Sequence, residues 1–108
     1  MRTKTRLMLL AVSLASLTTT ASYAAGNAEA GQSKAFTCMG CHGVASYNNV
    51  YPTYHVPKLG GQHAKYLVSA LQGYKSGQRS HGTMQAQASN LSDQDMEDIA
   101  AYFEGRTE

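Results

Sequence analysis

Apolar residues recur at intervals of three and four in the middle of the chain, which is the spacing of an amphipathic helix. The stretch runs from about Gln62 to Ser76, and it is followed by Gly77, a residue type that commonly ends helices. The pattern predicts a helix over 62–76 with one face in the interior. The apolar residues of that face are Tyr66, Leu67, Ala70, Leu71 and Tyr74.

The last part of the chain predicts another helix, with signals for both of its ends. Ser92 followed three residues later by Asp95 is typical of a capping box, in which each side chain bonds the backbone N–H of the other residue. Leu91 and Met96 are placed to form a hydrophobic staple around this start. The expected buried face consists of Ile99, Tyr102 and Phe103, before a stop at Gly105.

A third helix is expected near the start of the chain, from about Asn27 to Gly40, with Asn27 as its N-cap. Gly31 and Ala35 lie four residues apart and share one helix face, where a second helix could approach closely. Phe36 beside them is a candidate for the core. No stretch shows the apolar–polar alternation that is typical of a strand, so the pattern predicts an all-α fold with three main helices.

The first 24 residues have the features of a secretory signal peptide. A basic start is followed by an apolar run over residues 7–17, and small residues precede a cleavage point after Ala24. The apolar run is too short to span a membrane, which takes about 20 residues. We therefore expect cleavage, export to the periplasm in a bacterium, and a single mature domain over 25–108 without a membrane span.

Removal of the leader changes the net charge. The whole chain carries nine Lys/Arg and seven Asp/Glu, but three of the basic residues lie in the leader. The mature chain is therefore nearly neutral and gives no reason to expect binding to nucleic acid. No Asp or Glu lies between Ala30 and Ser92, whereas six acids lie in the last sixteen residues. This separation predicts a marked dipole.

The segment Cys38-Met39-Gly40-Cys41-His42 is the most specific chemical signal, because this spacing is the attachment signature of a c-type haem. On one helical turn, positions i, i+3 and i+4 share a face. Cys38 and Cys41 could therefore reach the two vinyl groups along one edge of a porphyrin. His42 could present a ring nitrogen to the iron.

The two cysteines allow two other interpretations. A dithiol redox pair would be expected beside a βαβ pattern, and none follows here. A zinc site would need four ligands at workable spacing, whereas these are the only two cysteines of the chain.

The order of these elements resembles the class I cytochromes c, in particular the small bacterial proteins with a single haem. The matching segments are Cys38 to Gly43, Pro57 to Gln62, and Leu91 to Phe103. The resemblance implies the small cytochrome c fold, with three helices around one haem c and its iron, covalently attached through the two cysteines.

The resemblance also implies roles for individual residues. His42 would be the proximal axial ligand, and the carbonyl group of Pro57 would accept a hydrogen bond from its ring. Leu59 would pack on the haem face, and Tyr102 would lie where the first and last helices cross. The loop over 44–56, rich in tyrosine and asparagine, departs from the family's pattern, and its role stays open.

Met84 is the favoured ligand for the second axial position. It lies 42 residues after His42, in the expected loop between the second and third helices, and this length of chain can reach the opposite face of the ring. Met39 lies within the attachment turn and cannot fold back across the ring. Met96 has a sufficient structural role in the staple.

The histidines are the competing ligands, because imidazole also binds haem iron. His81 is the main competitor, since it lies three residues before Met84 in the same loop. For His55 and His63 we expect surface positions.

These observations predict a periplasmic electron carrier that moves single electrons through a His/Met-ligated haem and catalyses no reaction of its own. Its expected partners are redox proteins that dock transiently. The part of the chain between Ala30 and Ser92, which has Lys and Arg but no Asp or Glu, is expected to steer acidic partners. An alternative is a haem-containing enzyme subunit or small-molecule sensor with a displaceable sixth ligand, as His81 and the tyrosine-rich loop suggest. A thiol–disulfide oxidoreductase would need free cysteines.

Overall fold

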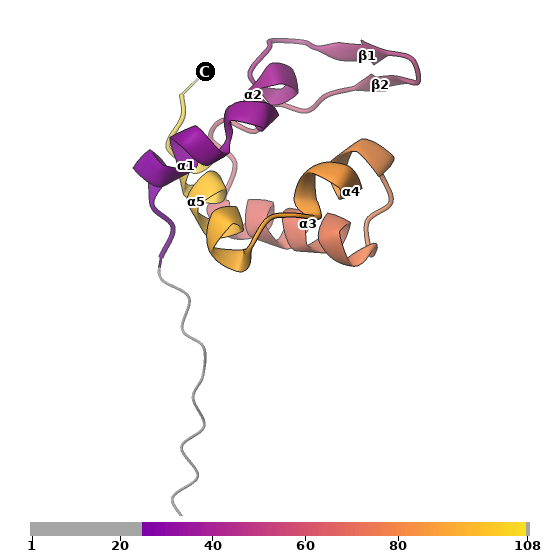
Figure 1. Ribbon diagram of the computed structural model, residues 1–108. Coiled ribbons are helices and arrows are strands. Elements are labelled where there is room, and N and C mark those ends of the chain that lie inside the picture. The colour runs from indigo at the N-terminus through magenta and orange to yellow at the C-terminus, as the bar shows by residue number, and fades with distance from the viewer. Residues whose placement is uncertain (1–24, 108) are drawn as a thin grey trace, which may run out of the picture.

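The computed structural model describes residues 25–107, so the predicted signal peptide lies outside the described residues. The elements are α1 (Ala28–Lys34), α2 (Phe36–His42), β1 (Asn48–Val50), β2 (Thr53–His55), α3 (Ala64–Ser76), α4 (Gly82–Ala88) and α5 (Asp93–Glu104). In Figure 1, α1, α2 and the hairpin of β1 and β2 form one side of the molecule, α3 and α4 form the other, and α5 lies beside α1. Among residues 25–107, none of the helices is both long enough and apolar enough to cross a membrane.

The core lies where α3 and α5 meet, below α1. The predicted faces of both helices contribute to it, and Met96 and Phe103 are its largest fully buried side chains. Cys38, Leu59 and Leu71 are partly buried against this core. The buried residues of this core are Ala35, Leu67, Val68, Met96, Ile99, Ala100 and Phe103.

The packing of α1 on α5 depends on a glycine. A Cβ atom at Gly31 would lie 1.9 Å from the Asp98 carbonyl oxygen and 2.9 Å from the Tyr102 Cβ. These distances are far below van der Waals contact, so no larger residue fits without a shift of the helices. The predicted close approach at Gly31, with Tyr102 at the crossing, is confirmed.

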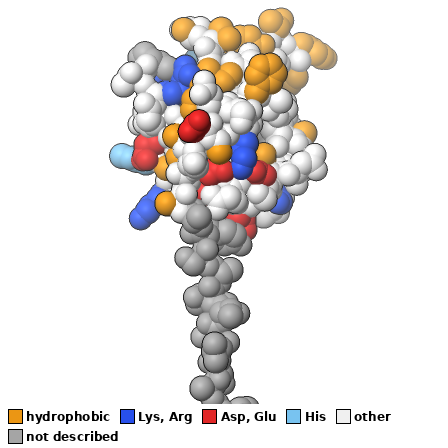
Figure 2. Space-filling view, turned by 60° about the vertical axis from the view of Figure 1, so that its left-hand side comes forward, with side chains coloured by type: hydrophobic (Ala, Val, Ile, Leu, Met, Phe, Trp, Pro, Cys, Tyr) orange, Lys and Arg blue, Asp and Glu red, His pale blue; other side chains and the backbone are white. Residues whose placement is uncertain are grey.

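Asp98 stabilises the same crossing of α1 and α5 with hydrogen bonds. Its side chain is buried and accepts the Asn27 backbone N–H at 2.8 Å and the Lys34 Nζ at 2.6 Å. Lys34 also pairs with Asp95 at 2.8 Å. The Asn27 N–H, followed by Lys34, lowers the pKa of Asp98 to about 2, and Lys34 lowers the pKa of Asp95 to about 2. Figure 2 shows basic and acidic side chains interleaved on this face.

Most of the predicted helix ends are confirmed. Asn27 caps α1, and the Ser92–Asp95 capping box is present in both directions at the start of α5. α3 ends at Gly77, whose φ of 80° lies in the left-handed region that favours glycine.

The first predicted helix is divided. The chain breaks at Ala35, which has ψ near zero, and resumes as α2. Ala35 takes the buried position, and the change of direction turns Phe36 outward, where it is 81% exposed. The prediction that Phe36 belongs to the core is therefore wrong.

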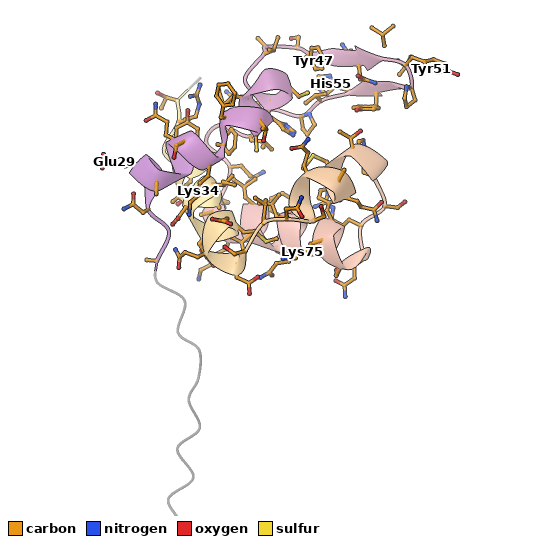
Figure 3. All side chains as sticks on the ribbon, viewed as in Figure 1. Glu29, Lys34, Tyr47, Tyr51, His55 and Lys75 are labelled. Atoms are coloured by element: carbon orange, nitrogen blue, oxygen red, sulfur yellow. The ribbon has the colours of Figure 1, made fainter. Side chains whose placement is uncertain are left out.

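The segment after α2 contains a short hairpin, which the sequence pattern did not indicate. β1 and β2 are antiparallel, with Asn48 opposite His55 and Val50 opposite Thr53. Three-residue strands are too short for a recognisable alternation. Tyr51 at the tip is 95% exposed, and it points away from the helices in Figure 3.

The expected loop around Met84 is also different, because it contains the helix α4. His81 is its N-cap, and its side chain accepts the Met84 backbone N–H. The sequence of α4 is mainly small and polar residues, so it lacks the apolar periodicity that signals a helix.

Candidate functional site

A cavity of about 410 Å³ opens between the two sides of the fold. Its walls come from α2, the segment 54–59, α3, α4 and the inner face of α5. Most of the lining side chains are apolar or aromatic, and no Asp or Glu lines this cavity among residues 25–107. This size and lining are typical of a cofactor site.

Helix α2 brings the predicted attachment residues to one wall. Cys38, Cys41 and His42 all line the cavity, as expected for positions i, i+3 and i+4 of one turn. Cys38 is half-buried and Cys41 is exposed. Burial raises the pKa of the Cys38 thiol, whereas a redox-active cysteine needs a lowered pKa. This microenvironment disfavours the thiol–disulfide oxidoreductase.

The ring of His42 is held by the backbone. Its Nδ1 lies 2.7 Å from the Pro57 carbonyl oxygen, which can only accept a hydrogen bond, so Nδ1 must carry the proton. The lone pair is then on Nε2, the nitrogen that is free to bind a metal. A carbonyl partner of this kind also fixes the ring's orientation and raises its basicity.

Met84 lies across the cavity, in the first turn of α4, and is half-buried. The other two methionines of residues 25–107 are elsewhere: Met96 is fully buried in the core, and Met39 packs against the core from α2. Leu59 lines the cavity and is partly buried against the core.

The histidines differ in what their rings contact. His81 lines the cavity, but its Nδ1 already accepts the Met84 backbone N–H at 3.4 Å. His55 also lines the cavity, and its Nδ1 bonds the Asn48 side chain at 3.1 Å. The side chain of His63 is 87% exposed at the start of α3.

Several further residues line the cavity beside the predicted ligands. Tyr54 belongs to the hairpin, in the tyrosine-rich segment whose role the sequence leaves open. The Arg79 guanidinium stacks on the Tyr74 ring at 4.7 Å and donates to the Tyr66 hydroxyl at 3.4 Å. Gly73 makes room for it, because a Cβ there would lie 3.0 Å from the Arg79 Cγ. The helical spacing places Tyr66 and Tyr74 on one face, but no spacing rule connects Arg79 to that face.

The donor set does not suit a bare metal ion. Among the described residues, no three His, Cys, Asp or Glu side chains lie close enough together to hold one. This finding disfavours the zinc interpretation, since a zinc site usually has four protein ligands or three and a water. The cavity instead offers two thiols on one helix turn, one oriented imidazole and one thioether, around an apolar space.

The family model for cytochrome c matches residues 28–106. The chain belongs to the cytochrome c family. It is similar to cytochrome c4 of Pseudomonas aeruginosa, with 48% identity over 81 residues, which cover 75% of this chain and 39% of that protein. It is also similar to cytochrome c-554(548) of Halomonas halodenitrificans, with 45% identity over 82 residues, which cover 73% of this chain and 95% of that protein.

A solved structure extends the likeness to the fold. The reduced recombinant cytochrome c4 from Pseudomonas stutzeri matches with a TM-score of 0.58 and 29% identity, over 76% of this chain and 52% of that one. The chain therefore spans about half or less of the cytochromes c4 that it matches, and nearly all of cytochrome c-554(548).

Family membership supplies the cofactor. Cytochromes c carry covalently attached haem c with its iron, and the class I cytochrome c suggested by the sequence is confirmed, as is its all-α fold. The residues around the cavity fit this group, because they combine thiols and nitrogen and sulfur donors with an apolar enclosure.

Proposed function

We propose that this cytochrome c is a periplasmic carrier of single electrons whose haem is attached at Cys38 and Cys41 and bound axially by His42 and Met84. The observation that carries the proposal is that His42, with its Nδ1 bonded to Pro57, and Met84 line one apolar cavity from α2 and α4. These helices lie on opposite sides of the fold (Figure 1).

When bound, the haem supplies an iron that alternates between ferrous and ferric states. The protein's residues set the conditions for that exchange. Pro57 holds the His42 ring in one orientation, and a thioether from Met84 favours the reduced state more than a second imidazole would. If His42 and Met84 both hold the iron, no position on it would remain for a substrate, which supports a carrier rather than an enzyme.

The enclosure contributes by keeping water away. Leu59, Ile99 and Phe103 form part of an apolar lining that raises the cost of a charge change in the cavity and so tunes the potential. The exposed position of Cys41 keeps one edge of the attachment turn at the surface, where electrons could enter and leave.

The assignment of Met84 is tested by the near-infrared charge-transfer band between a thioether sulfur and ferric iron. Met84→Ala should abolish this band. His81→Asn is the matched control, because asparagine can still cap α4 but cannot replace an imidazole ligand. The band should survive in His81→Asn, and its persistence in Met84→Ala would show that Met84 is not the ligand.

Carbon monoxide separates the carrier from the enzyme subunit or sensor. A carrier with both ligands in place should resist carbon monoxide in the reduced state at neutral pH. Ready binding by the unmodified protein would favour a displaceable sixth ligand and contradict the carrier.

The cellular location and the partners are further parts of the proposal. The leader-like residues 1–24 support export to the periplasm. The cavity lining includes Lys58 and Arg79 but no acid among the described residues, which supports transient docking of acidic redox proteins on this side.

A further inference from the structure

The side chain of Tyr54, on β2 of the hairpin, contacts α4 and its N-cap across the cavity. Its hydroxyl oxygen lies 3.3 Å from the Thr83 Oγ1, and its ring meets the His81 ring edge-on with centroids 4.8 Å apart. Thr83 directly precedes Met84, and the His81 Nδ1 accepts the Met84 backbone N–H. Tyr54 therefore touches the residue that caps the Met84 N–H and the residue directly before Met84.

Helix α4 needs such support. It has seven residues, and helices shorter than about 12 residues are not stable by themselves in water. Within residues 25–107, α3 is the one element whose backbone packs against α4. On the side that faces the cavity, α4 is held by side-chain contacts.

The same short segment reaches the other wall. Pro57, which bonds the His42 ring, lies three residues after Tyr54. Between them, Val56 is buried, and its N–H bonds the Tyr47 carbonyl oxygen at 2.9 Å, which closes the base of the hairpin. Residues 54–57 thus contact both the His42 ring and the helix that carries Met84.

We propose that Tyr54 is a positioning residue that holds the first turn of α4, and with it Met84, against the cavity. The inference rests on the proposed ligand role of Met84. At 3.3 Å the hydroxyl contact is long for two oxygen atoms, so most of the effect comes from the ring against His81. Residues 54–57 then link the His42 ring to the helix that carries Met84.

Amide hydrogen exchange in the haem-loaded protein tests the mechanical part of this inference. Tyr54→Phe, which removes only the hydroxyl group, should speed exchange in α4 about twofold, and Tyr54→Ala about tenfold. Exchange in α5 should not change and serves as the internal reference. Tyr51→Phe and Tyr51→Ala are the matched controls, because Tyr51 belongs to the same hairpin but is 95% exposed at its tip.

Cyanide binding to the ferric protein tests the link to Met84. If Met84 must leave before cyanide enters, Tyr54→Ala should speed binding about tenfold, while the Tyr51 variants bind at the unmodified rate. In a Met84→Ala background, Tyr54→Ala should have no further effect, since there is no longer a thioether to position. A change in global stability alone would not produce this dependence on Met84.

The outcomes separate this inference from the proposed function. Unchanged α4 exchange in Tyr54→Ala would overturn the positioning role, even if the near-infrared band assigns Met84 as the ligand. It would also be overturned if Tyr54→Ala speeds amide exchange in α4 but binds cyanide at the same rate as the unmodified protein. A missing near-infrared band in the unmodified protein would instead contradict the assignment of Met84 as a ligand. The amide exchange rates would still test whether Tyr54 stabilises α4.

Discussion

The hydrogen bond from His42 to Pro57 decides which ring nitrogen of the imidazole can bind a metal. A carbonyl oxygen can only accept, so the 2.7 Å contact fixes the proton on Nδ1 and leaves the lone pair on Nε2. Because the acceptor is a backbone atom, the contact depends on the path of the chain at residue 57 rather than on a side chain. The orientation of one ring is thus a property of the loop that follows the hairpin.

A second residue-scale feature, the buried carboxylate of Asp98, predicts a pH dependence. Its pKa is about 2 in the folded protein, against 3.8 for an unperturbed aspartate. A lowered folded-state pKa adds stability that is present above the unfolded-state value and is lost as the pH falls towards 2. Urea unfolding between pH 5 and pH 2 should therefore show a steeper loss of stability in the unmodified protein than in Asp98→Asn. Parallel curves would contradict this account of Asp98.

At the scale of elements, the crossing of α1 and α5 is the most constrained contact. Gly31 faces a backbone carbonyl group, which cannot move aside as a flexible side chain could. The ion pairs of Lys34 with Asp95 and Asp98 lie at the same crossing. This contact keeps α2, which follows α1 after the break at Ala35, in its place over the cavity.

Gly31→Ala should therefore destabilise the protein by about 2–4 kcal/mol, because the added methyl group overlaps the Asp98 carbonyl oxygen. Gln32→Ala, an exposed change in the same helix, should alter the free energy of unfolding by less than about 0.5 kcal/mol. Denaturant unfolding measures both. Equal effects of the two substitutions would show that the close approach is not a constraint.

The sequence predicted the elements whose signals are local. The Ser92–Asp95 box, the Asn27 cap, the stop at Gly77 and the glycine at the helix crossing all follow from short-range rules, and all are present. The prediction of an attachment turn rests in the same way on five consecutive residues, and the structure folds them within one helix.

The elements that the sequence did not predict depend on contacts made elsewhere in the chain. α4 has little apolar character of its own and is held by α3 and its His81 cap. The hairpin strands are too short to show a pattern, so the contact of Tyr54 with Thr83 could not be foreseen. Phe36 was misplaced because the break at Ala35 shifts the helical phase, and no proline or glycine marks this break.

At the scale of the whole molecule, the cavity occupies the place of a core in a small domain. Most of its lining side chains are apolar or aromatic, and a flat apolar group in the cavity would remove them from water. The haem is therefore a structural component of this fold as well as its redox group.

The separation of charge predicts salt-dependent association with a redox partner. Electron transfer with an acidic partner should slow as ionic strength rises, because screening weakens steering. Lys65→Glu, at an exposed position of α3, should lower the rate at low salt and flatten its salt dependence. Glu29→Lys, an exposed position on α1, is the control and should not lower the rate. Electrostatic steering would be excluded if the electron-transfer rate measured by stopped flow does not change with ionic strength.

Covalent attachment of haem to the turn at 38–42 is the claim that supports the rest, and denaturing electrophoresis with haem staining tests it most directly. The exported protein, made in cells that attach haem, should keep its haem on the denatured polypeptide, and Cys38→Ser/Cys41→Ser should lose it. A colourless exported protein, or a haem that separates from the unmodified chain on denaturation, would contradict the account.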